Sequence, residues 1–376
     1  MSNDICLVVT THSDGSFLDV YASSLAEEEM ARDTLIIAIP DRKTDPKLFK
    51  KSAEIERRGL KILCPTLAEQ DQFLHKLGGI QHIIPYDSNN RRNIGFLMAL
   101  EKGCQVLISV DDDNLPVPSG HFFREHLIVT QPSVEMETVH SANRWFNICD
   151  LLNLQTQNIY ARGFPYRYRH QSPEMAYCPE QGRVHLNAGL WLDSPDVDAI
   201  TWLANPTKVL SFNGTSLLLG HDTWSPVNTQ NTAVYRDAIA AYYYVQMGHT
   251  LMGYPIGRYG DIFSGYFCQA CVRHLGYRIR VGTPVVNHTR NHHKYLEDLT
   301  KEVACILLLE DITQWLQEVK LEGSTYIEVY LCLADLLEDA VERFSGFMWN
   351  EATRSYFHHM AYCMRTWVQA IRTMEG

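Results

Sequence analysis

The sequence of 376 residues lacks an excess of basic side chains. It has 33 lysines and arginines against 44 aspartates and glutamates, which gives a formal charge of −11 at pH 7. A surface that follows a nucleic-acid backbone needs a basic excess, so we expect no nucleic-acid partner. An anion must instead be captured locally, by a metal ion or by a focused group of arginines.

Long apolar runs and a disulfide framework are also missing. The longest strongly apolar stretch, residues 304–309, is far shorter than the roughly 20 residues that span a bilayer. The first residues show no basic start followed by an apolar run, and the ten cysteines are scattered. The composition, 45 % hydrophobic and 20 % charged, is that of a globular protein with a large core. We therefore expect a cytoplasmic protein with reduced thiols and no membrane span.

Strand and helix patterns alternate along the first part of the chain. Short apolar runs rich in β-branched residues are typical of buried strands, and they lie at residues 5–11, 34–40, 60–64 and 104–110. Helical spacing of apolar residues separates them. This alternation predicts a doubly wound, mostly parallel α/β sheet, in which ligands bind beyond the carboxyl ends of the strands.

The rest of the chain divides into two parts. Residues 125–228 are loop-rich, aromatic and arginine-bearing, whereas amphipathic helices follow residue 294. We predict a catalytic domain over residues 1–294 and a helical C-terminal extension over residues 295–376. These helices pack on the domain or form an interface of a homo-oligomer, for which the apolar stripe at residues 326–344 is the candidate.

Asp111, Asp112 and Asp113 directly follow an apolar run. Closely packed carboxylates raise one another's pKa and burial adds to the effect, so the triplet is costly unless a cation lies among them. A Mn²⁺ or Mg²⁺ ion would resolve this and keep positions open for a substrate diphosphate. A solvated acidic turn or a calcium site would give the same triplet. The strand context favours the metal–diphosphate interpretation.

Four more residues are placed to bind a nucleotide. Thr10 lies at the carboxyl end of the first strand, and Asp41 follows the second. Asp41 either accepts hydrogen bonds from a base or ribose or is a simple turn residue. Arg91 and Arg92 begin a helix, where they would hold phosphate through their guanidinium groups and the helix dipole. Their alternative is an exposed basic pair.

A histidine is available to complete the metal site. His288 follows the strand predicted over residues 281–286, and its neutral imidazole could join the aspartates as a ligand. His292 and His293 are close enough in sequence to be alternatives.

Several motifs in order resemble one known family. The segment 255–265 is PIGRYGDIFSG, with HLG at 274–276, and 187–199 is NAGLWLDSPDVDA. RGFPY begins at Arg162, with Arg169 seven positions later. With the aspartate triplet and the GTP segment before His288, these resemble the reversibly glycosylated polypeptides, the UDP-arabinopyranose mutase family. The resemblance extends from about residue 5 to 315.

The resemblance implies a GT-A fold, a UDP-sugar donor and a divalent metal. In the family the arginine matching Arg169 can itself receive a sugar, and the arginine matching Arg162 is needed nearby; ordinary phosphate or carboxylate partners are the alternative for both. The family's RYDD is RYGD here, its SLRE is RYRH, and about eight extra residues lie within residues 171–185. These departures fall in the acceptor half, which indicates a family-type donor site with a remodelled acceptor pocket.

The same motifs supply the remaining candidates. Asp261 opens a helix, where it would act beside the acceptor hydroxyl as a base or hydrogen-bond acceptor, or serve only as an N-cap. Arg258, just before it, is assigned to the nucleotide sugar. Trp191 is either an aromatic platform for a sugar or base or a core residue, and Asn231 could hydrogen-bond donor or acceptor hydroxyls.

Together these features predict a metal-dependent glycosyltransferase that moves a sugar from a UDP-sugar to a hydroxyl of a small-molecule acceptor. The first alternative is a UDP-sugar mutase that interconverts pyranose and furanose rings, with reversible self-glycosylation at Arg169. A third possibility is a non-catalytic partner that binds UDP-sugar and assembles through its C-terminal helices.

Overall fold

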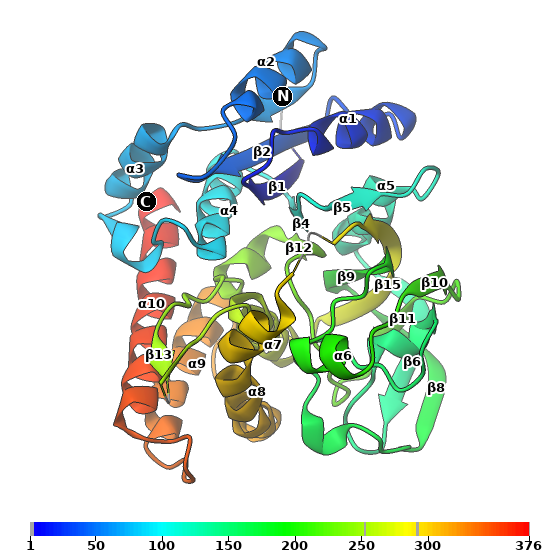
Figure 1. Cartoon of the computed structure of the whole chain (residues 1–376), viewed down its shortest axis with the longest axis vertical. Helices are drawn as coiled ribbons and strands as arrows, with labels where there is room; N and C mark the ends of the chain where they lie inside the picture. Colours follow the sequence, from blue (N-terminus) through cyan, green and yellow to red (C-terminus); the bar gives the residue numbers. More distant parts are fainter. Residues whose placement is uncertain (1–3, 252, 291–292, 376) are drawn as a thin grey trace.

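The computed structural model describes residues 4–251, 253–290 and 293–375. Within this part of the chain, the strands form one large mixed sheet and a small hairpin, and the C-terminal part is helical (Figure 1). The predicted fold class, a doubly wound α/β sheet followed by helices, is confirmed. No helix of the described part has the length and apolar character that crossing a membrane requires.

Four parallel strands form the N-terminal half of the sheet, in the order β3-β2-β1-β4. They are β1 (Ile5–Thr11), β2 (Thr34–Pro40), β3 (Lys61–Leu63) and β4 (Val106–Asp111). Helical segments connect them: α1 (Phe17–Glu27), α2 (Lys47–Arg57), α3 (Leu67–Lys76), η1 (Ile80–Ile83), η2 (Asn89–Arg91) and α4 (Arg92–Glu101). Because the strands are parallel, the residues that follow β1, β2 and β4 meet at one edge of the sheet.

The second half of the sheet is mixed and continues from β4 in the order β12-β9-β15-β11-β6-β8. Its strands are β5 (Asn114–Pro116), β6 (Val134–Ser141), β7 (Leu152–Leu154), β8 (Met175–Gly182), β9 (Val184–Asp193), β10 (Val209–Phe212), β11 (Leu217–Leu219), β12 (Asn231–Tyr235) and β15 (Arg278–His288). The expectation that residues 125–228 are loop-rich is therefore wrong in part. β8 is largely exposed and contains Pro179, and the first part of β6 is polar, so neither shows the apolar pattern of a buried strand.

Short helices and one long helix complete this half. They are α5 (Phe122–His126), η3 (Leu127–Thr130), η4 (Ile148–Leu151), η5 (Tyr166–Tyr168), α6 (Ala199–Ala204), η6 (Arg236–Ala241) and α7 (Gly260–His274), with the hairpin β13 (Thr250–Leu251) and β14 (Tyr254–Pro255). α7 is buried along almost its whole length. Gly265 makes this possible, because a Cβ atom there would lie 1.9 Å from the carbonyl oxygen of Val227.

Three helices follow: α8 (Tyr295–Glu318), α9 (Tyr326–Val341) and α10 (Glu351–Glu375). In Figure 1, α8 is gold, α9 is orange and α10 is red; α8 and α9 lie beside α7, and α10 contacts η1. The apolar side chains of α9 belong to the same hydrophobic core as those of the sheet. The division into domains 1–294 and 295–376 stays a prediction.

Candidate active site

A cavity of about 480 Å³ lies at the edge of the sheet where β1, β2 and β4 end. It contains most of the residues that the sequence predicts for donor binding and catalysis: Thr10, Asp41, Arg91, Arg92, Asp111, Asp112, Asp113, Arg162, Arg258, Asp261 and His288. These residues come from segments far apart in sequence. The strand ends and the start of α7 bring them together.

The three aspartates of the triplet occupy different electrostatic environments. Asp111 forms an ion pair with Arg92, and burial raises the pKa of Asp111 to about 6. Asp112 accepts a 2.5 Å hydrogen bond from the hydroxyl of Thr11, and burial raises its pKa. Burial would also raise the pKa of Asp113, but the neighbouring His288 outweighs it and lowers that pKa. Asp111 and Asp112 are thus costly to ionise without a cation, whereas His288 already favours the ionised form of Asp113.

His288 is oriented towards the triplet by its backbone contact. Its Nδ1–H donates to the carbonyl oxygen of Ser194 at 2.6 Å, which leaves Nε2 facing the carboxylate of Asp113 at 3.7 Å. A histidine held in this way through its other nitrogen is the arrangement typical of a metal ligand. His293 also lines the cavity, but its Nδ1 contacts Asp298 at 2.8 Å. His292, the other alternative, lies outside the described residues.

The donor set of Asp111, Asp113 and His288 fits a hard divalent cation in chemistry. Its atoms do not all lie within 4.8 Å of one another, as judged over the described residues. Asp111 is paired with Arg92, and Asp113 lies 3.7 Å from Nε2 of His288. A cation would have to share Asp111 with Arg92.

Arg91 and Arg92 are both buried, so the interpretation as an exposed basic pair is wrong. Arg92 donates to the hydroxyls of Thr10 and Ser109 and to two backbone carbonyls, which joins β1, β4 and the loop before β12. Arg91 lies 3.9 Å above the centre of the Tyr86 ring and donates to Gln70. Both side chains support the wall of the cavity as well as giving it positive charge.

The carboxylate of Asp41 is held by two backbone N–H groups and lies near Arg91. Its carboxylate accepts from the backbone N–H of Arg42 at 2.7 Å and of Ser88 at 3.3 Å, and it lies 3.9 Å from Nε of Arg91. Asp41 also begins a turn, because its carbonyl oxygen accepts from the backbone N–H of Thr44 at 3.0 Å. The turn alternative therefore fits. Asp41 is 8 % exposed and lines the cavity, and its contact with a base or ribose stays a prediction.

Arg162 bridges two carboxylates at the far side of the cavity. Its guanidinium forms paired hydrogen bonds with Asp196 and with Asp261, four in all, between 2.7 and 3.0 Å. Burial alone would lower the pKa of Arg162, but the two carboxylates outweigh it and raise that pKa. Asp261 lies in the first turn of α7, as predicted. The N-cap alternative is wrong, because Tyr259 occupies that position.

Arg258 lines the cavity from the segment before α7. Its Nε donates to Glu302 of α8 at 2.7 Å, and Nη1 lies 3.6 Å from Asp298. The C-terminal helices therefore help to position a residue of the cavity.

Three predicted residues lie away from the cavity wall. Arg169 donates to Asp198 at 2.6 Å and stacks on Tyr166, and neither Arg169 nor Asp198 lines the cavity. Trp191 is 2 % exposed, which fits the alternative interpretation that it is a core residue. Asn231 is fully buried, and its amide bonds to two backbone carbonyls and His126.

The sequence interpretation missed Arg290, which also lines the cavity. Its guanidinium lies 4.9 Å above the Trp202 ring and 5.6 Å above the Tyr295 ring. In the described part of the chain it forms no ion pair, and burial lowers its pKa. The signal was available: Arg290 follows His288 by two residues at the end of β15.

The fold and the cavity define an α/β protein with acidic and arginine side chains gathered at the strand ends. The family model described as reversibly glycosylated polypeptide matches residues 66–376. Because this match covers most of the chain, the chain belongs to the reversibly glycosylated polypeptide family.

Curated proteins that are similar in sequence to this chain are named as mutases. "Probable UDP-arabinopyranose mutase 1" of Pisum sativum is 29 % identical over 299 residues, which are 78 % of this chain and 74 % of the relative. "UDP-arabinopyranose mutase 1" of Arabidopsis thaliana is 29 % identical over 215 residues, 56 % of this chain and 54 % of the relative. The second alignment thus spans about half of the relative's length.

A solved structure is also similar to this chain, at a lower sequence identity. Glucosyl-3-phosphoglycerate synthase from Mycobacterium tuberculosis, in complex with Mn²⁺ and uridine-diphosphate-glucose, is 12 % identical with a TM-score of 0.38. The alignment covers 81 % of this chain and 78 % of that one.

Proposed function

We propose that the chain has a GT-A-type site that binds a UDP-sugar with Mn²⁺ or Mg²⁺ and breaks the bond between the sugar and the diphosphate. The observation that carries this proposal is the cavity in which the aspartate triplet and His288 face several arginines. Asp111, Asp113 and His288 would hold the cation. When bound, the cation would offset the diphosphate charge and stabilise the departing nucleotide.

Different residues of the cavity would bind different parts of the substrate. Asp41 offers a fixed carboxylate to the hydroxyls of a ribose or the N–H of a base. Arg290 is the cation best placed to contact phosphate, because its Nε has no hydrogen-bond partner among the described residues and, of their carboxylates, only the charge of Asp196, at longer range, acts favourably on it. Its stacking on Trp202 and Tyr295 holds the guanidinium plane with little loss of conformational freedom on binding.

We further propose that the sugar passes to a hydroxyl of a small molecule. A second cavity of about 620 Å³ adjoins the first and shares Ser88, Asn89, Tyr244 and Arg258 with it. This space supports a separate acceptor. Asp261, whose carboxylate Arg162 holds in place, would accept a hydrogen bond from the acceptor hydroxyl and orient it.

A UDP-sugar mutase is the second candidate, and the names of the curated relatives favour it. Both candidates require the same donor site and break the same bond. Self-glycosylation at Arg169 would require this side chain to leave Asp198 and turn into the cavity. Its present position therefore favours transfer to an external acceptor, and assembly into a homo-oligomer stays a prediction.

One incubation separates these candidates. The purified chain is mixed with Mn²⁺ and a panel of UDP-sugars, with and without small hydroxyl acceptors, and the products are followed by mass-resolved chromatography. Released UDP with a glycosylated acceptor supports the transferase, whereas a new peak of unchanged donor mass supports the mutase. Asp113→Asn should abolish either product, and Asp335→Asn, which alters a surface ion pair on α9, should leave it unchanged. Equal turnover by Asp113→Asn would contradict the proposed site.

A further inference from the structure

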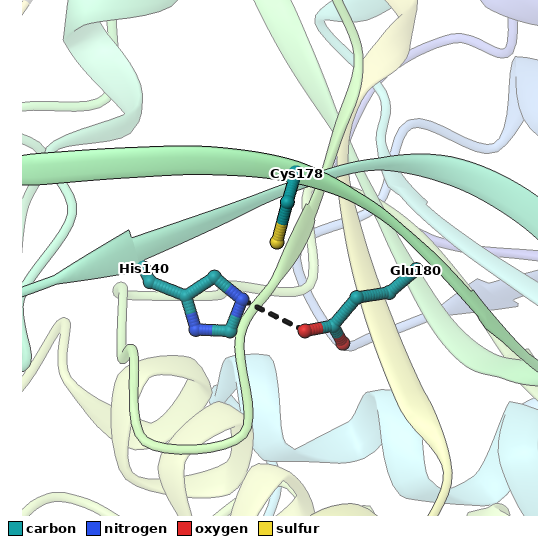
Figure 2. Close-up of side chains that lie close together, drawn as sticks. All are labelled: His140, Cys178 and Glu180. Atoms are coloured by element: carbon teal, nitrogen blue, oxygen red, sulfur yellow. Dashed lines mark hydrogen bonds and ion pairs between the residues drawn. The ribbon is translucent and has the colours of Figure 1, made fainter.

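Three potential metal ligands converge on the face of the sheet formed by β6 and β8 (Figure 2). Cys178 and Glu180 are two residues apart on β8, so their side chains leave the same face. His140 comes from the antiparallel neighbour β6, and its Nε2 lies 2.8 Å from Oε1 of Glu180. The Cys178 side chain points between the other two. The three ligand atoms all lie within 4.8 Å of one another.

The chemistry of these ligands matches a zinc ion. Zn²⁺ binds thiolate sulfur at about 2.3 Å and imidazole nitrogen or carboxylate oxygen at about 2.0–2.2 Å, in a tetrahedron whose ligand atoms are about 3.3–3.8 Å apart. Small side-chain rotations would bring the present spacing into that range. Cys178 is exposed, and His140 and Glu180 keep 39 % and 26 % of their side chains exposed, so an ion can enter from solvent. A thiolate and a carboxylate would balance its charge.

The surroundings hold two of the ligands in position. Oε2 of Glu180 accepts from Arg278 at 3.1 Å, and Oε1 accepts from Nε2 of His140 at 2.8 Å. An ion would replace the hydrogen bond between Oε1 and Nε2 and bind both atoms, while Arg278 keeps the carboxylate in place. The ring of His140 lies against Gly220, where a Cβ atom would be 2.5 Å from Nδ1 of the ring. Only glycine at position 220 leaves room for this ring orientation. The contacts therefore fix the histidine and carboxylate independently of any ion.

The cluster is separate from the cavity described above, because none of its members lines that cavity. β8 is the end strand of the sheet order and falls within residues 171–185, where the family resemblance predicts extra residues. An exposed end strand presents unpaired backbone groups and is held on one side only. A metal ion shared by β6 and β8 would fasten this strand to the sheet.

We propose that His140, Cys178 and Glu180 form a zinc site that fastens β8 to β6, with water as the fourth ligand. On binding, the Cys178 thiol gives its proton to solvent as the sulfur–zinc bond forms. The proton that Nε2 of His140 donates to Glu180 moves to Nδ1 or to solvent, so that Nε2 can bind the ion, and no oxidation state changes. Zinc affinity therefore increases as pH rises.

The test uses the full chain, stripped with a chelator and titrated with Zn²⁺ by calorimetry. Cys178→Ser and His140→Ala should each weaken this binding at least 10-fold, whereas the matched variants Cys332→Ser and His75→Ala should not change it. Asp113→Asn separates this site from the cavity and should retain the affinity. Replacing Zn²⁺ with Co²⁺ should give a thiolate charge-transfer absorption that Cys178→Ser abolishes. Equal Zn²⁺ affinity in the wild type and Cys178→Ser, or loss of all binding in Asp113→Asn, would overturn the proposal.

Discussion

Replacing Arg162 with methionine should destabilise the fold strongly, because it leaves two buried carboxylates without their cation. The side chains of Arg162, Asp196 and Asp261 are 4 %, 4 % and 6 % exposed. Four hydrogen bonds between charged groups are lost together. Removing one partner of a buried ion pair costs about 3–5 kcal/mol, so the free energy of unfolding should fall by that amount at pH 7.

The pH dependence provides a sharper form of this prediction. Burial would raise the pKa of Asp196, but the charge of Arg162 outweighs it and lowers that pKa below the unfolded value. This contribution is present above the unfolded pKa of about 3.9 and is lost as pH falls through the folded pKa. In Arg162→Met, buried Asp196 has no cation beside it, so its pKa in the folded state is raised instead. The folded variant therefore binds a proton as the pH falls from 7 to 4, and this binding stabilises it. The stability gap between the two proteins should therefore narrow between pH 7 and pH 4.

Urea denaturation followed by circular dichroism measures both effects. Arg365→Met is the matched control, since Arg365 also contacts two carboxylates, Asp335 and Glu338, but at the surface. It should lose no more than about 1 kcal/mol. A loss below about 1 kcal/mol for Arg162→Met, or a gap that does not narrow towards pH 4, would refute the reasoning.

Three further predictions concern other residues. Arg290→Met should weaken binding of UDP with Mn²⁺ by about 10- to 150-fold, because one charged phosphate contact of about 1.5–3 kcal/mol is lost, and it should leave the free energy of unfolding unchanged. Unchanged affinity in calorimetry would count against the phosphate contact. Burial lowers the pKa of His126 to about 3, so it binds a proton only in the unfolded chain between pH 6.5 and about 3. Stability is full above pH 6.5 and should fall by about 1.4 kcal/mol per pH unit below it, a slope that urea denaturation should find flatter in His126→Gln. Gly265→Ala should destabilise by more than about 2 kcal/mol because α7 must move away from Val227, and a normal melting temperature would contradict that packing.

The part of the cavity that we propose for the donor was predictable because its residues follow strong strand patterns. β1 and β4 are apolar almost throughout, so their ends were recognisable, and parallel strands place their ends together. Thr10, Asp111 and Asp113 were found in this way. His288 was predicted in the same way, because it lies at the end of β15.

The acceptor half was less predictable, because partners chosen in the folded chain decide which side chains face the cavity. The sequence motif does not show that Asp198 holds the Arg169 side chain away from the cavity, or that Asp196 holds the Arg162 side chain at the cavity wall. Trp191 is apolar enough for either a platform or the core, and packing placed it in the core. β8 escaped recognition because it is an exposed strand with polar residues on both faces.

The most direct test of the account is the consumption of UDP-sugars by the wild-type chain and Asp113→Asn, each with EDTA and with added Mn²⁺. The account predicts that the wild type consumes at least one UDP-sugar with Mn²⁺, stops in EDTA and recovers when Mn²⁺ is restored, and that Asp113→Asn consumes none. The central claim would be contradicted by consumption that persists in EDTA, or by a wild type that neither consumes nor binds any UDP-sugar with Mn²⁺.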